Sequence, residues 1–227
     1  MKERWIQGLS ANFDLRKARM LQMQLAKKVI KNDLLPKNLE LVAGIDVSYT
    51  RNIAVAAIAT LNYGTMKVIE NKVNTVKQRF PYIPTLLSFR EAPAIFSVLK
   101  KLKLKPDVYL VDAQGLAHPR RFGLACHIGV IRKIPTIGVA KSRLFGKVGD
   151  FKKNRAPVTD NGEVIANVLL KRRGRPLYVS LGHMVNLERA VDVVEHFIDS
   201  DCRTVIPIMF AHMLATEEKN RLLEAMT

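Results

Sequence analysis

The chain between residues 39 and 76 reads LELVAGIDVSYTRNIAVAAIATLNYGTMKVIENKVNTV. It contains three runs rich in aliphatic residues, separated by the polar breaks Thr50-Arg51-Asn52 and Tyr63-Gly64. Such closely spaced runs predict three strands, 39–49, 53–61 and 66–76, that form an antiparallel meander. One residue does not fit, because Asp46 interrupts the apolar run of the first strand. A lone ionised carboxylate there costs several kcal/mol, so it must be protonated, paired or bound to a cation.

Two further carboxylates lie in segments that otherwise read as buried. Asp112 ends the apolar run 108–111, and Glu91 lies near the start of a predicted helix. If the strands that carry Asp46 and Asp112 are parallel neighbours, the two side chains converge where open α/β sheets bind ligands. Converging acids typically hold divalent metal ions, whereas isolated aspartates at strand ends are more often caps. Spacing alone leaves both interpretations open.

The remaining pattern alternates helices and strands. Helices are predicted over 14–31, 86–102, 120–131, 187–198 and 207–225. Further strands are predicted over 107–112 and 136–140, with two more between residues 164 and 181. A meander followed by βα units predicts an α/β fold, a mixed sheet flanked by helices. The 227 residues are expected to form a single domain, 1–227, with a basic insertion at about 142–176.

The charge balance indicates the partner. The chain has 37 lysine and arginine residues against 20 aspartate and glutamate residues, a formal net charge of +17. Residues 132–175 hold 12 basic and 3 acidic residues, whereas residues 176–227 hold 4 basic and 8 acidic residues. Such a basic segment attracts a polyanion. Glycines and a proline interrupt it and it lacks a long apolar span, so nucleic acid is favoured over a membrane.

Two features bear on the cellular environment. Residues 1–10 contain no apolar core of signal-peptide length, so we expect the protein in the cytoplasm, or in the nucleus of a nucleated cell. Cys126 and Cys202 lack the paired spacing of a zinc site or redox couple, and both are expected to be reduced core residues.

Four motifs occur in order along the chain. They are Val42-Ala43-Gly44-Ile45-Asp46-Val47-Ser48-Tyr49, Pro81-Tyr82-Ile83-Pro84 through Leu87-Ser88-Phe89-Arg90-Glu91, Asp112-Ala113-Gln114-Gly115-Leu116-Ala117-His118-Pro119-Arg120, and Ile137-Gly138-Val139-Ala140-Lys141-Ser142. Together they closely resemble the endonuclease V family of deoxyinosine-directed repair nucleases, from about residue 15 to residue 212.

The resemblance implies a ribonuclease H-like fold and a hydrolase. The implied reaction is magnesium-dependent hydrolysis of the second phosphodiester bond 3′ to an inosine base, leaving 5′-phosphate ends, with Mn²⁺ as the expected substitute for Mg²⁺. The implied partner is damaged DNA, with RNA as an alternative, and the protein is expected to act as a monomer.

By motif match, the metal ligands of the family correspond to Asp46, Glu91 and Asp112, and Lys141 corresponds to a lysine near the scissile phosphate. Lys141 follows a predicted strand, so its ammonium group could reach the acids and neutralise developing phosphoryl charge. The alternative is an ordinary surface lysine. His212 falls where the family has Asp or His at the metal edge, although a buried packing histidine fits its neighbours equally well.

A stiff aromatic turn is the next implied element. Pro81, Ile83 and Pro84 surround Tyr82, and in the family this turn acts as a wedge that enters the base stack. The alternative is a hydrophobic plug packed on the domain. A deaminated base must be turned out of the duplex for inspection. The candidate pocket residues by resemblance, each equally consistent with turn geometry or core packing, are Leu87, Gly115, Gly123, Gly138 and Leu144.

Basic residues near these motifs form the expected nucleic-acid footprint. His118 precedes Pro119-Arg120-Arg121, a group suited to contacting phosphate. The arginines of the footprint are Arg120, Arg121, Arg143, Arg172 and Arg173. His127 and His196 fall in amphipathic helices and are expected to be structural.

The chain departs from the family pattern at several positions. Family members usually carry Asp-Gly-His-Gly where this chain has Asp112-Ala113-Gln114-Gly115, and Pro-Gly-His where it has Leu181-Gly182-His183. Thr85 replaces a usual glycine, and the segment 207–212, which includes Met209, lacks a usual Thr-Arg pair. These departures are expected to alter the pocket more than the metal site.

Two competing functions remain open at this level. A nuclease of the same fold for inosine-RNA or branched junctions would use the same acids with another specificity. A non-catalytic nucleic-acid-binding module would explain the net charge of +17 but leave three costly carboxylates without a role. Metal-dependent cleavage of a substrate panel separates these possibilities.

Overall fold

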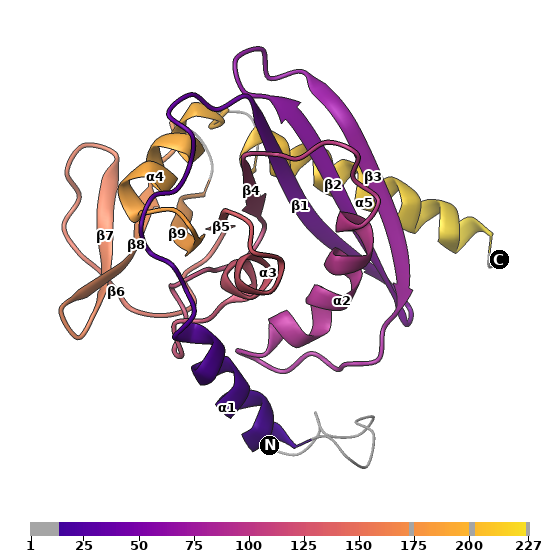
Figure 1. Ribbon diagram of the computed structural model, residues 1–227, viewed down its shortest axis with the longest axis horizontal. Helices are drawn as coiled ribbons and strands as arrows, with labels where there is room; N and C mark the ends of the chain where they lie inside the picture. Colours follow the sequence, from indigo (N-terminus) through magenta and orange to yellow (C-terminus); the bar gives the residue numbers. More distant parts are fainter. Residues whose placement is uncertain (1–13, 173–174, 200–202, 226–227) are drawn as a thin grey trace.

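The computed structural model describes residues 14–172, 175–199 and 203–225. Within them, nine strands form one sheet in the order β3-β2-β1-β4-β5-β9-β8-β7-β6, and helices cover both faces of the sheet (Figure 1). The strands are β1 (Leu41–Thr50), β2 (Ile53–Asn62), β3 (Val68–Lys77), β4 (Val108–Val111), β5 (Thr136–Ala140), β6 (Lys147–Val148), β7 (Arg155–Asp160), β8 (Glu163–Leu169) and β9 (Leu177–His183). The helices are α1 (Leu15–Ala26), α2 (Leu87–Leu99), α3 (Leu124–Arg132), α4 (Leu187–His196) and α5 (Ile206–Glu224).

The first three strands confirm the predicted meander. β1 pairs antiparallel with β2, and β2 pairs antiparallel with β3. On its other side, β1 pairs in parallel with β4, with Ile45 opposite Val111. The strand that carries Asp46 and the strand that leads into Asp112 are therefore parallel neighbours, as convergence of the two acids requires.

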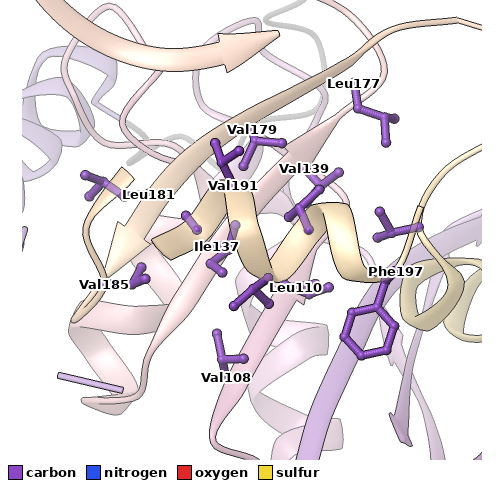
Figure 2. Packing of buried hydrophobic residues seen from close by; sticks show 14 of the residues in the cluster. Val108, Leu110, Ile137, Val139, Leu177, Val179, Leu181, Val185, Val191 and Phe197 are labelled. Carbon is purple, nitrogen blue, oxygen red and sulfur yellow. The ribbon is translucent and has the colours of Figure 1, made fainter. Parts of the chain in front are cut away.

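Two apolar layers lie on opposite faces of the sheet. On one face, α2 and α3 pack against β1, β2 and β4 through side chains such as Ile45, Ile95 and Ile128. On the other face, α4 covers β4, β5 and β9, and Figure 2 shows Val191 of this helix over Ile137 and Val179. Full burial of each such side chain contributes about 1.5–3 kcal/mol. The layers hold the central strands, and hence the acids, in a fixed register.

Gly44 lets α5 lie directly on β1. A Cβ atom at this position would lie 2.0 Å from the carbonyl oxygen of Pro207, so a side chain would displace the helix. Asp46 is two residues further along β1 and points to the same face of the sheet. The close approach therefore brings His212, one turn and a half after Pro207, over Asp46.

Several predicted helix boundaries were wrong, and two strands were missed. The helix expected over 120–131 begins at Leu124, because Arg121 adopts a left-handed φ of 52° and Gly123 is extended at the N-cap. The first helix ends at Ala26 rather than at Lys31. β6 and β7 were not predicted, since the lysines and Pro157 of this region hide the alternation typical of a strand.

Residues 142–176, predicted as a basic insertion, contain β6, β7 and β8, and these strands extend the sheet beyond β9. Their buried face includes Val158 and Ile165. Cys126 is a buried free thiol, and burial raises its pKa to about 12, whereas Cys202 lies outside the described residues. None of the described helices combines the length and the apolar composition needed to cross a membrane.

Candidate active site

The three predicted acids meet beside the carboxyl end of β4. The backbone N–H of Asp112 donates to the carbonyl oxygen of Ile45 at 3.1 Å, which sets Asp112 alongside Asp46 of β1. Glu91 approaches from the second turn of α2 and is only 9% exposed. Three segments that are distant in sequence thus deliver one carboxylate each to the same place.

Burial and the charges of neighbouring carboxylates raise the pKa values of two acids, Glu91 and Asp46. Burial raises the pKa of Glu91 to about 8; a hydrogen bond from Tyr49 opposes the shift, and the charges of Asp46 and Asp112 add to it. Burial, and then the charge of Asp112, also raises the pKa of Asp46, against a hydrogen bond with His212. The cluster therefore resists carrying all its negative charge without a cation.

Each acid has one partner from another element. Nδ1 of His212 in α5 lies 2.7 Å from Oδ2 of Asp46. The Tyr49 hydroxyl donates to Oε1 of Glu91 at 3.1 Å. Nζ of Lys141, directly after β5, forms an ion pair with Oδ2 of Asp112. The structure thus brings all five predicted catalytic residues together and adds Tyr49, which lay within the first sequence motif.

The donor set fits a divalent cation such as Mg²⁺. Carboxylate oxygens are its preferred protein ligands, and its charge would relieve the repulsion that raises the two pKa values. Among the residues that the structure describes, no three Asp, Glu, His or Cys side chains are already arranged as a metal-binding cluster. Asp46, Glu91 and Asp112 are instead paired with His212, Tyr49 and Lys141. Metal binding would therefore require some of these contacts to open.

A cavity of about 210 Å³ adjoins the acids. Ala113, which follows Asp112, and Ala140, which precedes Lys141, both line it. The predicted site residues that line the cavity are Tyr82, Leu87, His118, Gly123, Arg143 and Leu144. The lining residues that the sequence did not assign to the pocket are Gln22, Thr85, Ser88, Ala113, Gln114, Phe122, Leu124, Ala140 and Ser142. Several of these lay inside the quoted motifs, where their types gave no sign of a cavity.

Gly115 and Gly138 do not line the cavity. A Cβ atom at Gly138 would lie 2.4 Å from the backbone nitrogen of Gly115, and one at Gly115 would lie 2.1 Å from the carbonyl oxygen of Leu181. Both glycines allow the segment after β4 to pack closely on β5 and β9. This packing is the alternative interpretation that their sequence context allowed.

The turn around Tyr82 is anchored at both ends. At one end, the carbonyl oxygen of Phe80 accepts from Gln78 at 2.6 Å and from Arg90 at 2.8 Å. At the other end, Thr85 has a left-handed φ of 68°, and its carbonyl oxygen accepts from Gln22 at 3.0 Å and from Arg120 at 2.9 Å. Between these anchors the Tyr82 side chain is 51% exposed. Exposure on a fixed turn is what a wedge requires, and the wedge role stays a prediction.

The flanking prolines and Ile83 do not line the cavity. Pro84 is exposed, whereas Pro81 and Ile83 are half-buried. Their contribution is the shape of the turn that presents Tyr82.

His118 holds this turn and is not free for phosphate. It is 3% exposed, and its Nδ1 accepts from the backbone N–H of Arg120 at 3.2 Å. Nε2 must then carry the proton and donate to the carbonyl oxygen of Thr85 at 3.0 Å. Burial, and then the Arg120 charge, lowers the pKa of His118 to about 4. The imidazole is therefore a neutral structural link at neutral pH.

Two of the five footprint arginines have partners within the protein. Arg120 donates to Oε1 of Gln22 at 2.7 Å in addition to Thr85. Arg121 pairs with Asp160 at 2.6 Å and with Glu163 at 2.8 Å, which ties the loop before α3 to β7 and β8. These contacts correct the expectation that both guanidinium groups face nucleic acid.

Arg143 and Arg172 are exposed, and Arg173 lies outside the described residues. Arg172 lies in the loop between β8 and β9. Because Ala140 at the end of β5 is opposite Tyr178 near the start of β9, β9 begins at the same end of the sheet as Lys141. Arg172 is therefore placed toward the end of the sheet that carries Lys141, and Arg143 follows Lys141 by two residues.

The two histidines that were predicted to be structural, His127 and His196, have internal contacts. His127 packs among the rings of Phe89, Phe96 and Phe122, and burial lowers its pKa to about 4. His196 stacks on Tyr63 and lies 2.8 Å from the Tyr63 carbonyl oxygen.

Comparisons with known proteins agree with this geometry. The family model described as Endonuclease V matches residues 23–213. An endonuclease V from Thermofilum pendens is 42% identical over 212 residues, which cover 93% of this chain and 91% of the relative. The crystal structure of endonuclease V from Streptomyces avermitilis has a TM-score of 0.84 at 31% identity, covering 96% of this chain and 98% of that chain.

A third relative is bound to a nucleic acid. Endonuclease V of Ciona intestinalis, in complex with a 24mer DNA containing an inosine followed by a ribo-adenosine, has a TM-score of 0.83 at 30% identity. The alignment covers 91% of this chain and 98% of that chain. These structural matches confirm the predicted ribonuclease H-like mixed sheet flanked by helices.

Proposed function

Because the chain belongs to the endonuclease V family, whose members are nucleases that act on DNA, we propose that it is a divalent-metal-dependent, inosine-directed endonuclease. The specific substrate is deoxyinosine in DNA, the metal is Mg²⁺, and the bond cut is the second phosphodiester 3′ to the lesion, leaving a 5′-phosphate. The observation that carries the proposal is the meeting of Asp46, Glu91 and Asp112 next to a base-sized cavity, with the pKa values of Asp46 and Glu91 raised.

The acids have the roles that phosphodiester hydrolysis needs. Asp46, Glu91 and Asp112 would hold the cation, which supplies an activated water and stabilises the leaving oxygen. Tyr49 orients Glu91 through its hydroxyl group, at 3.1 Å from Oε1. Such partners of metal ligands fix the orientation of the carboxylate.

Lys141 and His212 supply the remaining chemistry. Lys141 is paired with Asp112, and if Asp112 held the cation, the Lys141 ammonium group would be available to neutralise the charge that develops on the phosphoryl oxygens. His212 is 54% exposed beside Asp46, so its imidazole can orient a water or move a proton at the edge of the site. Neither role requires a residue that the fold keeps buried.

The cavity can hold the base that marks the site of cleavage. A base turned out of the duplex can enter beside Ala113 and Ala140, and its own backbone phosphates then lie next to Asp112 and Lys141. Loss of normal pairing makes a deaminated base cheaper to extrude. The exposed Tyr82 would fill the space that the base leaves in the stack.

One gel tests the proposal. Labelled duplexes with and without a single deoxyinosine are incubated with Mg²⁺ or with chelator, and the products are sized to the nucleotide. We expect one nick, at the second phosphodiester 3′ to the inosine, only with Mg²⁺. Equal cutting of both duplexes, or cutting with chelator, would contradict the proposal.

A second candidate substrate is inosine in RNA. The DNA bound to the Ciona intestinalis relative has a ribo-adenosine directly after the inosine, so a member of the family accommodates a ribonucleotide there. Matched strands with inosine followed by a deoxyribonucleotide, by one ribonucleotide, or within RNA throughout separate the two substrates by their cleavage rates.

A further inference from the structure

Four buried polar side chains face the cavity, and two of them are fully paired inside the protein. Gln22 donates through Nε2 to the carbonyl oxygens of Thr85 and Phe122, and its Oε1 accepts from Arg120. His118 uses both ring nitrogens. These two side chains therefore build the cavity wall, and each of their polar atoms already has a partner in the protein.

Unlike Gln22 and His118, Gln114 and Ser88 each have a polar atom without a partner. Gln114 is 8% exposed and Ser88 is 2% exposed, and both line the cavity. Oε1 of Gln114 and Oγ of Ser88 are buried and have no hydrogen-bond partner in the protein. Buried polar atoms in folded proteins are nearly always paired, so each unpaired one needs an explanation such as a functional role or a bound water or ion.

The orientation of the Gln114 amide is fixed. Its Nε2 donates to the carbonyl oxygen of Ser142 at 2.8 Å. Because a carbonyl oxygen only accepts, the amide cannot turn over without losing this bond. Oε1 is therefore held as an acceptor, and it is the atom of this side chain that has no hydrogen-bond partner in the protein.

We propose that Gln114 determines base specificity by accepting a hydrogen bond on Oε1 from the lactam N1–H of hypoxanthine, while the Ser88 hydroxyl donates to O6. This inference rests on the proposed function and assigns the recognition of its substrate to two residues. Hypoxanthine has a donor at N1, whereas adenine has an acceptor there. Adenine in the same pose would bring two acceptors together, at a cost that hypoxanthine avoids. Ser88 can donate or accept, so the discrimination lies with Gln114.

The size and the lining of the cavity suit one planar base. Its volume of about 210 Å³ is below the range of about 300–1,000 Å³ typical of drug-sized ligands. Leu87, Phe122, Leu124 and Leu144 supply apolar surface for the ring faces. A few fixed polar groups in an apolar cavity are the usual arrangement for orienting a ligand.

Binding and cleavage are measured on three matched duplexes that differ only in one base: hypoxanthine, adenine, or unsubstituted purine, which lacks both O6 and the N1–H. Dissociation constants are measured by fluorescence anisotropy with chelator, and single-turnover cleavage is measured with Mg²⁺. The variants are Gln114→Met, which keeps the length but removes the acceptor, Gln114→Glu, which keeps an acceptor oxygen, and Ser88→Ala. Gln24→Met changes an exposed glutamine of α1 and is the matched control.

We expect Gln114→Met to lower the binding preference for hypoxanthine over purine about tenfold, the effect of one hydrogen bond in a buried site. Gln114→Glu should retain more of this preference than Gln114→Met, Ser88→Ala should lower it a few-fold, and Gln24→Met should leave it unchanged. An unchanged preference in Gln114→Met, with a melting temperature equal to that of the wild type, would overturn the inference.

The remaining outcomes distinguish a failure of this inference from a failure of the proposed function. If Gln114→Met fails to fold, Ser88→Ala carries the test, and an unchanged preference in that variant overturns the assignment. If the wild type binds hypoxanthine preferentially but cuts no duplex, the proposed nuclease function fails, while loss of the binding preference in Gln114→Met still supports the inference. If the wild type cuts at inosine and Gln114→Met keeps the full preference, the function stands and the inference fails.

Discussion

The acid cluster and the cavity beside it are built on opposite principles. In the acid cluster, Asp46, Glu91 and Asp112 are forced together, and burial and repulsion raise the pKa values of the first two. In the cavity wall, neutral polar groups such as Gln22 and His118 are paired within the protein, and both donate to the carbonyl oxygen of Thr85. The first region needs a cation to complete it, whereas the second needs only a ligand with a matching donor and acceptor.

Residues of the acid cluster and residues of the cavity wall are direct neighbours in the sequence. Asp112 belongs to the cluster and Ala113 to the cavity wall, and Ala140 and Lys141 divide in the same way. Changes to the acids should therefore affect the reaction, and changes to the turn and the cavity should affect the choice of substrate.

The largest expected effect is the loss of cleavage when one acid is neutralised. Asp46→Asn or Asp112→Asn should lower single-turnover cleavage of a deoxyinosine duplex by about a thousandfold or more, because an amide weakens metal ligation while keeping the shape. Binding of the same duplex should persist. The exposed Asp33→Asn is the control. Full magnesium-dependent activity in either variant would remove the acid cluster from the mechanism.

The next effect concerns the pH dependence of stability. Glu91 of the acid cluster and His127, which packs on the cavity residue Phe122, contribute to it with opposite sign. The folded pKa of His127, behind the cavity, is lowered to about 4, so the unfolded chain binds a proton first as the pH falls below about 6.5. Its contribution to stability is complete above pH 6.5 and is lost toward pH 4, on the order of 2–3 kcal/mol. The pKa of Glu91 is raised to about 8, so its contribution in the metal-free protein is instead lost as the pH rises through 8.

His127→Phe should therefore reduce the acid sensitivity of folding. Denaturant unfolding at pH 7 and pH 4 gives the loss of stability for wild type and variant. The loss should be smaller in the variant, with Phe89, Phe96 and Phe122 providing an apolar surrounding for the new ring. An equal loss in both proteins would show that His127 does not titrate in this range.

A smaller effect is expected at the wedge turn. Tyr82→Ala removes a stacking surface worth about 1–3 kcal/mol per base, so it should reduce the ratio of inosine to undamaged cleavage more than it reduces metal binding. Tyr82→Phe, which keeps the ring, is the matched control. If Tyr82→Ala leaves the ratio unaltered, the exposed ring has no part in recognition.

The smallest effect is on salt dependence. Arg172→Ala should weaken binding to all sequences and flatten the plot of log affinity against log salt by about one charge. Arg132→Ala is the matched control, because Arg132 ends α3 just before β5 and so lies at the opposite edge of the sheet. Equal salt slopes for Arg172→Ala and wild type would show that Arg172 does not contact the nucleic acid and that another surface binds it.

The sequence predicted the acid cluster better than the cavity for a physical reason. A carboxylate in an apolar strand is conspicuous because its burial is costly, and the strand order that joins Asp46 to Asp112 follows from the meander and the βα units. The cavity residues come from α1, α2, the start of α3, the end of β5 and three loops, and each is ordinary in its local context. Gln22 and Thr85, for example, are 63 residues apart and are linked only by a tertiary hydrogen bond.

The same reason explains the errors. Arg120 and Arg121 have the composition of a phosphate-binding pair, but partners distant in sequence, Gln22, Asp160 and Glu163, occupy their donors. β6 and β7 were missed because their pairing, rather than their composition, makes them strands. Local pattern predicted the elements of the central sheet, and tertiary contacts decided the rest.

The central claim, that the acid cluster holds a divalent cation, is tested most directly by titrating Mn²⁺ into the DNA-free protein and following free Mn²⁺ by electron paramagnetic resonance. Wild type should remove Mn²⁺ from solution, and Mg²⁺ should compete for the same site. The double variant Asp46→Asn/Asp112→Asn, with its folding confirmed by thermal melting, should leave the Mn²⁺ signal at the level of protein-free buffer. Equal Mn²⁺ binding by wild type and the double variant would contradict the account.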